Sequence, residues 1–453
     1  MKKYDVVVIG LGPAGMAVTN IAAEMGLKVL AVESRNVGTD QPSAESTPSS
    51  PILSATENNP LLAEPFARIN ADIGHIRDKK ITALAGKADL VLGQGYASFV
   101  NEHCIQVAGK EYSGKNIFIA TGTRPLIPPI EGLDQVDFLT NENLFELDAI
   151  PASMTFIGGG TIGCEMAQAF AKMGAKCTII HDKPHLLPYG EKHAGEILQR
   201  SFEKMGMNVH NACRITHVSK REDGRIVVHT DDGLEIESDK LMVAAGRNYD
   251  FSSLNLEKAG VEYGSKGIVV DEYLRTTNKY IHAVGDCNGS FLLSNAASHQ
   301  GMLALVNTVV VAPLKKKYLK NPAPWTVYTD PQISHVGRTT AELEAEGVEY
   351  EVIEAKIGDS EDAEGKAESY VRVFASSAGS IHGVSIVGGN SSEMISEWSL
   401  AIQHNINIYD LMMTMQSFPT MGFVSKQIGE TGETWMMQNV QPSLVKKILR
   451  FLF

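Results

Sequence analysis

The sequence YDVVVIGLGPAG at residues 4–15 decides the fold of this chain. Residues 4–10 form an almost continuous apolar and β-branched run, which is typical of a strand buried on both faces of a parallel sheet. The run enters Gly10-x-Gly12-x-x-Gly15, and the apolar positions that follow have a helical period. The stretch therefore predicts a strand, a glycine-rich turn and a helix, which together open a dinucleotide-binding fold.

Each glycine of this turn has its own physical task. Gly10 permits the tight turn, Gly12 lets a pyrophosphate approach the backbone, and Gly15 lets the helix pack on the strand. Pro13 and Ala14 stand at the start of the helix, where free N–H groups and a partial positive charge suit a phosphate. We expect these five residues to hold the pyrophosphate of a dinucleotide.

A carboxylate follows at the required spacing. Glu33 ends the run KVLAVE, about 20 residues after Gly12. An acid at the end of the second strand binds the hydroxyl pair of a ribose. The first turn and Glu33 therefore predict one complete dinucleotide site.

A second unit of the same kind lies in the middle of the chain. The strand-like run at 154–157 enters Gly158-x-Gly160-x-x-Gly163, and a helical pattern follows. Two strand–glycine–helix units on one chain predict two dinucleotide sites.

The strand-end position of the second unit carries His181, followed by Asp182. Arginines, which the 2′-phosphate of NADPH would require, are absent there, and Asp182 would repel a phosphate. Either side chain could hydrogen-bond a free ribose hydroxyl, which favours NADH over NADPH. The alternative is that His181 is a surface residue without a role.

Three further apolar runs end in turns at the carboxyl ends of predicted strands, where α/β sheets bind ligands. The residues at these turns are Thr121 and Gly122, Gly246, and Gly285 and Asp286. Asp286 can accept a hydrogen bond from a sugar-like hydroxyl.

The composition excludes several classes of protein. The 453 residues suffice for about three domains. A formal net charge of −13 argues against a nucleic-acid-binding face. Five scattered cysteines without a CxxC pair indicate reduced thiols in a cytoplasm rather than a disulfide framework, and they offer no zinc site.

Together these residues resemble the pyridine nucleotide-disulfide oxidoreductase family, which contains glutathione reductase, lipoamide dehydrogenase and mercuric reductase. The resemblance covers nearly the whole chain. Its motifs are the fingerprint with Glu33, ATG at 120–122, GGGTIGCE at 158–165, AAGRN at 244–248, AVGD at 283–286 and DPQISHVG at 330–337. In the third motif, Thr161, Ile162 and Glu165 join the glycines as NAD(P) residues.

The resemblance implies an α/β fold with two Rossmann-like domains, bound FAD and NAD(P)H, and a C-terminal α+β dimerisation domain in a homodimer. The implied FAD-binding domain spans 1–148 and 248–321, and the NAD(P)-binding domain spans 149–247. The dimerisation domain spans 322–440, and an amphipathic tail spans 441–453.

The chain departs from the family at the redox-active disulfide. The family carries CxxxxC after the strand that ends in the acid. Aligned by its Pro-Ser pair, this chain has Gln41 and Ser46 at the two cysteine positions. Aligned by its Gly-Thr pair, it has Asp40 and Glu45 there. Neither register restores a thiol.

Other reactive groups are also replaced. The family's lysine beside the flavin becomes Ser50 or Ser49, whereas its partner glutamate is kept as Glu165. The C-terminal HPTxxE base dyad becomes FPTMGF, with Phe418 and Phe423 in place of the histidine and the glutamate. Dithiol exchange needs two sulfurs and a base, so disulfide reduction by the family mechanism is close to excluded.

Hydride transfer from a nicotinamide to a flavin needs none of the lost groups. The sequence therefore predicts an NAD(P)H-dependent flavin oxidoreductase with a small non-disulfide acceptor, such as a quinone stacked on the apolar face around Phe418 and Phe423. In an alternative reading these rings only fill the dimer interface. Two other hypotheses are a cofactor-binding sensor or assembly protein with little turnover and a reductase for a protein electron-transfer partner.

The last residues, SLVKKILRFLF, form a basic amphipathic pattern. The pattern suits a membrane surface, although docking on the partner subunit is the favoured reading. No apolar stretch reaches the about 20 residues that a membrane-spanning helix needs.

Overall fold

The computed structural model describes residues 2–34, 82–318, 322–357 and 369–439, together with Phe66 and Lys79. The chain divides into two compact units. The first consists of Met1–Gly158, Lys172–Ala175 and Ile215–Lys320, and the second of Gly159–Ala171, Lys176–Arg214 and Asn321–Phe453.

The first unit is built on a mainly parallel sheet with the strand order β3-β2-β1-β6-β5-β4, in which β19 also pairs with β6. The strands are β1 (Lys2–Ile9), β2 (Val29–Glu33), β3 (Asp89–Leu92), β4 (Ser98–Asn101), β5 (Cys104–Val107), β6 (Lys110–Ile119) and β19 (Ile281–Ala283). Val6 and Val8 enter one hydrophobic cluster, whereas Val7 and Ile9 enter the other. The first strand is therefore buried on both faces, as its unbroken apolar run predicts.

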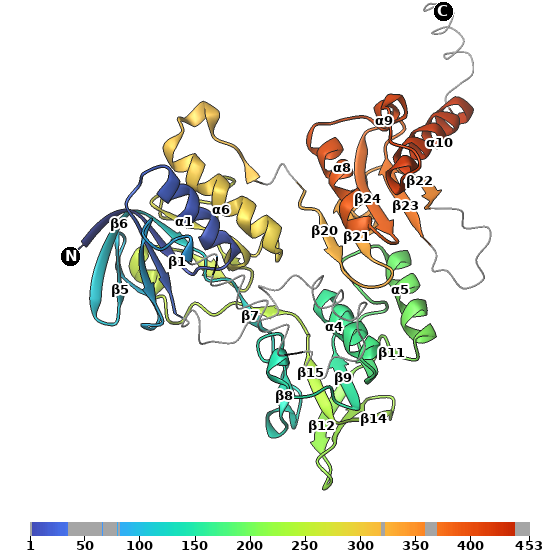
Figure 1. The fold of residues 1–453 in the computed structure, drawn as a ribbon, viewed down its shortest axis with the longest axis horizontal. Helices are drawn as coiled ribbons and strands as arrows, with labels where there is room; N and C mark the ends of the chain where they lie inside the picture. The colour runs from blue at the N-terminus through green and yellow to red at the C-terminus, as the bar shows by residue number, and fades with distance from the viewer. Residues whose placement is uncertain are drawn as a thin grey trace, which may run out of the picture. The chain divides into compact units, whose positions relative to one another are not determined.

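Two helices cover one face of this sheet. Helices α1 (Pro13–Glu24) and α6 (Ser294–Val309) pack side by side (Figure 1). A Cβ at Gly301 would collide with the carbonyl oxygen of Ala14, so the two helices approach closely through a glycine. This packing fixes the start of α1, where the first glycine turn ends.

The second dinucleotide-binding module contributes to both units. In the first unit, β15 (Lys240–Val243) pairs in parallel with β9 (Ser153–Ile157) and β8 (Phe138–Leu139). In the second unit, β10 (Lys176–Ile180) pairs in parallel with β11 (Asn208–His210), next to α4 (Thr161–Lys172) and α5 (Lys192–Lys204).

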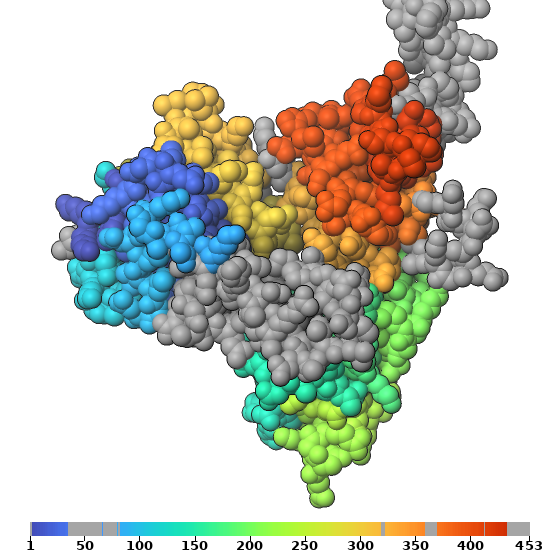
Figure 2. Space-filling model, in the orientation of Figure 1, coloured from blue at the N-terminus to red at the C-terminus, as the bar shows by residue number. Residues whose placement is uncertain are grey.

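A separate antiparallel sheet is inserted in this module. It consists of β12 (Ile215–Lys220), β13 (Ile226–Thr230) and β14 (Glu235–Ser238). It is drawn in yellow-green and is exposed on the face seen in Figure 2. The sequence analysis does not predict this sheet.

The C-terminal domain is α+β, as predicted. Its antiparallel sheet has the order β20 (Trp325–Val327), β21 (Ile333–Gly337), β24 (Ile381–Val387), β23 (Tyr370–Ala375) and β22 (Glu351–Lys356). Helix α8 (Ser391–Gln403) packs on β21 and β24, and α10 (Val424–Asn439) packs on β22 and β23. Trp398 of α8 is fully buried in the core between them.

The remaining elements are short. They are β7 (Arg124–Pro125), β16 (Arg247–Asn248), β17 (Tyr263–Gly264), β18 (Gly267–Ile268), α7 (Thr340–Glu346) and α9 (Ile408–Met413), with 3-10 turns at Leu133–Gln135, Leu144–Glu146, Leu256–Ala259, Asp286–Asn288, Ala312–Leu314 and Met421–Phe423.

The predicted fold class is confirmed, whereas the predicted domain boundaries stay a prediction. None of the helices in the described part of the chain has both the length and the apolar composition needed to cross a membrane.

Candidate functional site

The first glycine turn leaves space where a pyrophosphate would need it. A Cβ at Gly10 would collide with the carbonyl oxygen of Ala120, and one at Gly15 would collide with that of Gly10. A Cβ at Gly12 would meet no atom within 4 Å. The outer glycines are therefore required by packing, and the middle one leaves its backbone open to a ligand.

Glu33 lies at the end of β2 and is tied to this turn. Its Oε2 accepts a hydrogen bond from the backbone N–H of Leu11 at 2.8 Å. The carboxylate is thus held beside the turn, at the place where an acid binds ribose hydroxyls.

A second carboxylate belongs to the same unit. Asp286 follows Gly285 directly after β19, and its Oδ2 lies 3.5 Å from the Thr123 hydroxyl. Arg247 donates from Nε to that hydroxyl at 2.8 Å. Burial raises the pKa of Asp286, whereas Arg247 and the Thr123 hydrogen bond act against this rise.

Thr123 and Arg247 are functional candidates that the sequence motifs alone did not assign. Their positions gave a signal, because Thr123 follows the predicted turn at Thr121 and Gly122, and Arg247 stands in the AAGRN motif. Their contact joins segments that are 124 residues apart, which spacing rules do not reveal.

This set of groups fits FAD. The open backbone at Gly12 and the start of α1 suit a pyrophosphate, and Glu33 suits a ribose. Asp286, oriented by Thr123, offers an acceptor for a further hydroxyl at the carboxyl end of β19. Thr121 is exposed beside it.

The second glycine turn has the same construction. A Cβ at Gly158 would collide with the carbonyl oxygen of Ala244, whereas one at Gly160 would meet no atom within 4 Å. Thr161, Ile162 and Gly163 follow in the first turn of α4. The open backbone at the middle glycine suits the pyrophosphate of a nicotinamide nucleotide.

The two candidates for the ribose of this nucleotide differ in exposure. His181 is only 6% exposed, and its Nδ1 accepts the N–H of Gly159 at 3.1 Å. The side chain of Asp182 is 66% exposed and pairs with Lys183 at 2.9 Å. His181 is therefore not a surface residue, and of these two Asp182 is the one open to solvent.

Gly246 has a positive φ of 129°, and a Cβ there would contact Leu126 at 3.6 Å. It therefore adopts a backbone conformation that favours glycine.

Glu165 holds helix α4 to the segment that follows β20. Its Oε1 accepts the backbone N–H of Tyr328 at 2.8 Å. One turn later, Gln168 accepts from the N–H of Asp330 at 2.7 Å and donates to its carbonyl oxygen at 2.9 Å. The expected position of Glu165 near the flavin and the nicotinamide stays a prediction.

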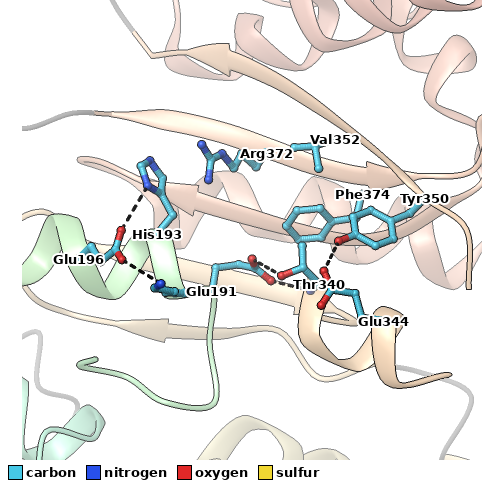
Figure 3. Close-up of a pocket in the computed structure, with 10 residues that line it drawn as sticks. Glu191, His193, Glu196, Thr340, Glu344, Tyr350, Val352, Arg372 and Phe374 are labelled. Atoms are coloured by element: carbon cyan, nitrogen blue, oxygen red, sulfur yellow. Dashed lines mark hydrogen bonds and ion pairs between the residues drawn. The ribbon is translucent and has the colours of Figure 1, made fainter. Parts of the chain in front are cut away.

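A cavity of about 300 Å³ lies between the start of α5 and the C-terminal sheet (Figure 3). Glu191 accepts two hydrogen bonds from Thr340, at 2.8 and 2.9 Å, and the Tyr350 hydroxyl donates to Glu344 at 3.0 Å. None of the predicted cofactor residues lines it. These groups bind one another, so the cavity belongs to the packing of the second unit.

Comparison with known proteins identifies the family. The model described as pyridine nucleotide-disulphide oxidoreductase matches residues 4–301, and that of the same family's dimerisation domain matches residues 323–427. The chain belongs to the pyridine nucleotide-disulfide oxidoreductase family. FAD and NAD(P)H are the cofactors of this family, and the dimerisation domain supports a homodimer.

Relatives in this family cover nearly the whole chain. The sequence is 31% identical to dihydrolipoyl dehydrogenase of Thermus scotoductus over 453 residues, which is 93% of this chain and 95% of that protein. It is 30% identical to mercuric reductase of Bacillus cereus over 443 residues, which is 92% of this chain and 70% of that protein.

A solved structure shows the same fold. The Cu(II) complex of RclA from Escherichia coli, an HOCl-induced flavoprotein disulfide reductase, aligns with a TM-score of 0.84 at 23% identity. The alignment covers 96% of this chain and all of that one.

The cysteine thiols of this chain are buried and shielded from solvent. All five cysteines are buried: Cys104, Cys164, Cys177, Cys213 and Cys287. Burial raises the pKa of Cys177 and Cys287 to about 12, and it also raises that of Cys164. A thiolate, the form that attacks a disulfide, is therefore disfavoured at these positions.

Phe418 and Phe423, which are predicted to replace the family's base dyad, lie close together. The rings of Phe418 and Phe423 meet edge to face with centroids 5.2 Å apart, and Phe418 is 77% exposed. Met421, between them in sequence, is also exposed.

Gln41, Ser46 and Ser50, at the predicted disulfide and lysine positions, lie outside the described residues, as does the C-terminal tail. Among the described residues, no group of three His, Cys, Asp or Glu side chains could hold a metal ion.

Proposed function

We propose that this chain is an NAD(P)H-dependent FAD oxidoreductase that passes electrons to a small non-disulfide acceptor, such as a quinone or a similar planar compound. One observation carries the proposal: every thiol of the chain is buried, and exposed phenylalanine replaces the base. An apolar aromatic surface favours stacking of a flat molecule.

The residues of the chain bind and orient the cofactors. When bound, FAD accepts a hydride from the nicotinamide and passes electrons on. Gly12 and Gly160 leave backbone open for the two pyrophosphates, and Glu33 and Asp286 offer acceptors to FAD hydroxyls. No described residue supplies an exposed thiol, so this chain would provide no thiol relay between a bound flavin and the acceptor.

NADH is the proposed nucleotide. Asp182 is an exposed acceptor for a ribose hydroxyl, and its charge opposes a 2′-phosphate. Lys183 pairs with this carboxylate and reduces that repulsion, so the expected preference for NADH is modest.

The decisive experiment is an anaerobic titration of the FAD-loaded protein with NADH and then NADPH, followed by a quinone series. We expect the flavin absorbance to bleach without a thiolate charge-transfer band, and quinones to reoxidise the flavin faster than oxygen does. Bound flavin that neither nucleotide reduces would instead support a sensor or assembly protein. Rapid bleaching with slow turnover on all quinones, restored by a cell extract, would support a protein acceptor.

A further inference from the structure

In both glycine turns of this chain, a backbone N–H at the same position of the turn donates a hydrogen bond to the side chain at the end of the next strand, but the acceptor group differs. In the first, the N–H of Leu11 donates to Oε2 of Glu33 at 2.8 Å. In the second, the N–H of Gly159 donates to Nδ1 of His181 at 3.1 Å. Leu11 and Gly159 both stand between the first and second glycines of their fingerprints. A carboxylate fills the acceptor role in one turn, and an imidazole fills it in the other.

This hydrogen bond fixes the protonation state of His181. A backbone N–H can only donate, so Nδ1 must carry a lone pair and the neutral ring bears its proton on Nε2. Nε2 is buried and has no hydrogen-bond partner among the described residues. A second proton on the ring would have to occupy Nδ1 and would remove the acceptor.

The peptide of Gly159 is held on both sides. Its carbonyl oxygen accepts the N–H of Leu187 at 2.8 Å and lies 3.4 Å from Sγ of Cys164. A Cβ at Gly159 would lie 2.6 Å from Leu186 and 2.9 Å from the ring of His181. The imidazole therefore packs directly on the turn, and a glycine between the fingerprint glycines makes room for it.

The groups around the ring keep it neutral. Burial lowers the pKa of His181 below its ordinary value of 6.5, and the nearby charges of Lys183 and His185 lower it further. The carboxylate of Asp182, exposed to solvent and 3.7 Å from Nδ1, and the backbone of His185 both act to raise this pKa, but burial outweighs them. His210 and Cys213 bind only the backbone of His181 in the described contacts.

We propose that His181 is a positioning residue whose neutral ring holds the second turn in its nucleotide-binding form. Protonation at Nδ1 removes the acceptor of the Gly159 N–H and releases the turn beside Gly160. Nucleotide binding to the protonated protein must then expel one proton to solvent. The inference rests on the proposed function in one respect, the assignment of this turn to NAD(P)H.

The test is calorimetric binding of NAD⁺, which does not reduce the flavin, to the oxidised FAD-loaded protein between pH 5 and pH 8. Below the pKa of His181, we expect the dissociation constant to rise tenfold for each pH unit. In His181→Asn, the amide oxygen replaces Nδ1 without titrating, so binding stays tight and independent of pH. In His181→Ala, the unpaired N–H weakens binding about tenfold at every pH.

His185→Asn is the matched control, because this neighbouring histidine does not contact the Gly159 N–H. It should keep the tenfold rise of the dissociation constant per pH unit, with a midpoint at a somewhat higher pH because the charge of His185 no longer lowers the pKa of His181. Wild-type binding that is flat with pH, or an acid dependence that persists in His181→Asn, would overturn the inference. Neither result contradicts the proposed function. The proposed function fails by a different result, namely that NAD⁺ binds but NADH does not reduce the flavin.

Discussion

Glu33 is expected to contribute to FAD affinity through its charge. A glutamine at this position keeps an oxygen for the Leu11 N–H but loses the carboxylate that we expect to accept hydrogen bonds from the FAD ribose. Hydrogen bonds to charged groups contribute about 1.5–3 kcal/mol, so Glu33→Gln should weaken FAD binding by roughly 10- to 100-fold. Flavin fluorescence on dilution measures this release. Glu24→Gln, at the exposed end of α1, is the control and should bind FAD normally.

Two buried histidines make stability depend on pH. Burial lowers the pKa of His282 and His335 from 6.5 to about 4. Between these values the unfolded chain holds a proton at each position that the folded chain does not, so acidification favours unfolding. We expect each histidine to cost about 3 kcal/mol as the pH falls from 6.5 to 4.

Urea denaturation at a series of pH values measures this loss. His282→Phe and His335→Phe should each make stability fall less steeply with acid, whereas the exposed His404→Phe should not. Equal pH slopes in all four proteins would contradict the prediction.

Substitutions at Phe418 test whether its ring binds the electron acceptor or only packs in the dimer interface. If its exposed ring stacks on the acceptor, Phe418→Ala should lower kcat/KM for quinones about tenfold, since aromatic stacking contributes about 0.5–1.5 kcal/mol. The rate of flavin reduction by NADH should stay unchanged in stopped-flow measurements. Phe418→Tyr keeps the ring and should retain activity. A loss of dimer without a change in the quinone step would favour the interface reading.

Helix α4 is fastened to the C-terminal domain through two polar side chains on one face. Gln168 is fully buried and satisfies both the N–H and the C=O of Asp330. Gln168→Leu keeps the volume but removes the acceptor of the Asp330 N–H, whereas the Asp330 carbonyl keeps the hydrogen bond from the Ser201 hydroxyl, so the change should cost roughly 1–3 kcal/mol. Chemical denaturation followed by tryptophan fluorescence tests this. Gln403→Leu, exposed at the end of α8, should stay within about 0.5 kcal/mol of the wild type.

Periodic and glycine-rich segments were predictable as elements. The apolar run at 4–10 and the run at 154–157 form β1 and β9, and the segments predicted at 371–374 and 383–387 lie in β23 and β24. The inserted sheet of β12, β13 and β14 was not predicted, because its short antiparallel strands carry no glycine fingerprint and only a weak alternation.

The spacing of the motifs predicted where the site residues stand in the sequence, but not which way their side chains point. They located His181 at the strand end, yet its ring turns under the Gly159 peptide because this glycine leaves room for it. They also located Asp286, but the Thr123 hydroxyl that contacts it and the Arg247 side chain that binds Thr123 come from distant segments. Such contacts depend on tertiary packing.

The dimerisation domain exposes methionine side chains in its C-terminal part. Met415 is 98% exposed, and Met413 is 80% exposed. Since this domain supports a homodimer, we expect these side chains to be covered by the partner subunit. Met415→Glu should therefore weaken dimerisation by at least tenfold in sedimentation experiments, through burial of a charge. Leu314→Glu, at an exposed site in the first unit, should leave the dimer intact.

The rate at which the buried cysteines are alkylated reports how often the structure around each of them opens. Because all five side chains are buried, an alkylating reagent reaches them only when the surrounding structure separates. Cys104 and Cys287 lie in the first unit, whereas Cys164, Cys177 and Cys213 lie in the second. Mass spectrometry of the labelled peptides would thus time the opening of each unit in the unmodified enzyme. If the chain works without a dithiol, as proposed, we expect the same shielding to let the folded protein keep its activity in the presence of electrophiles that inactivate dithiol enzymes.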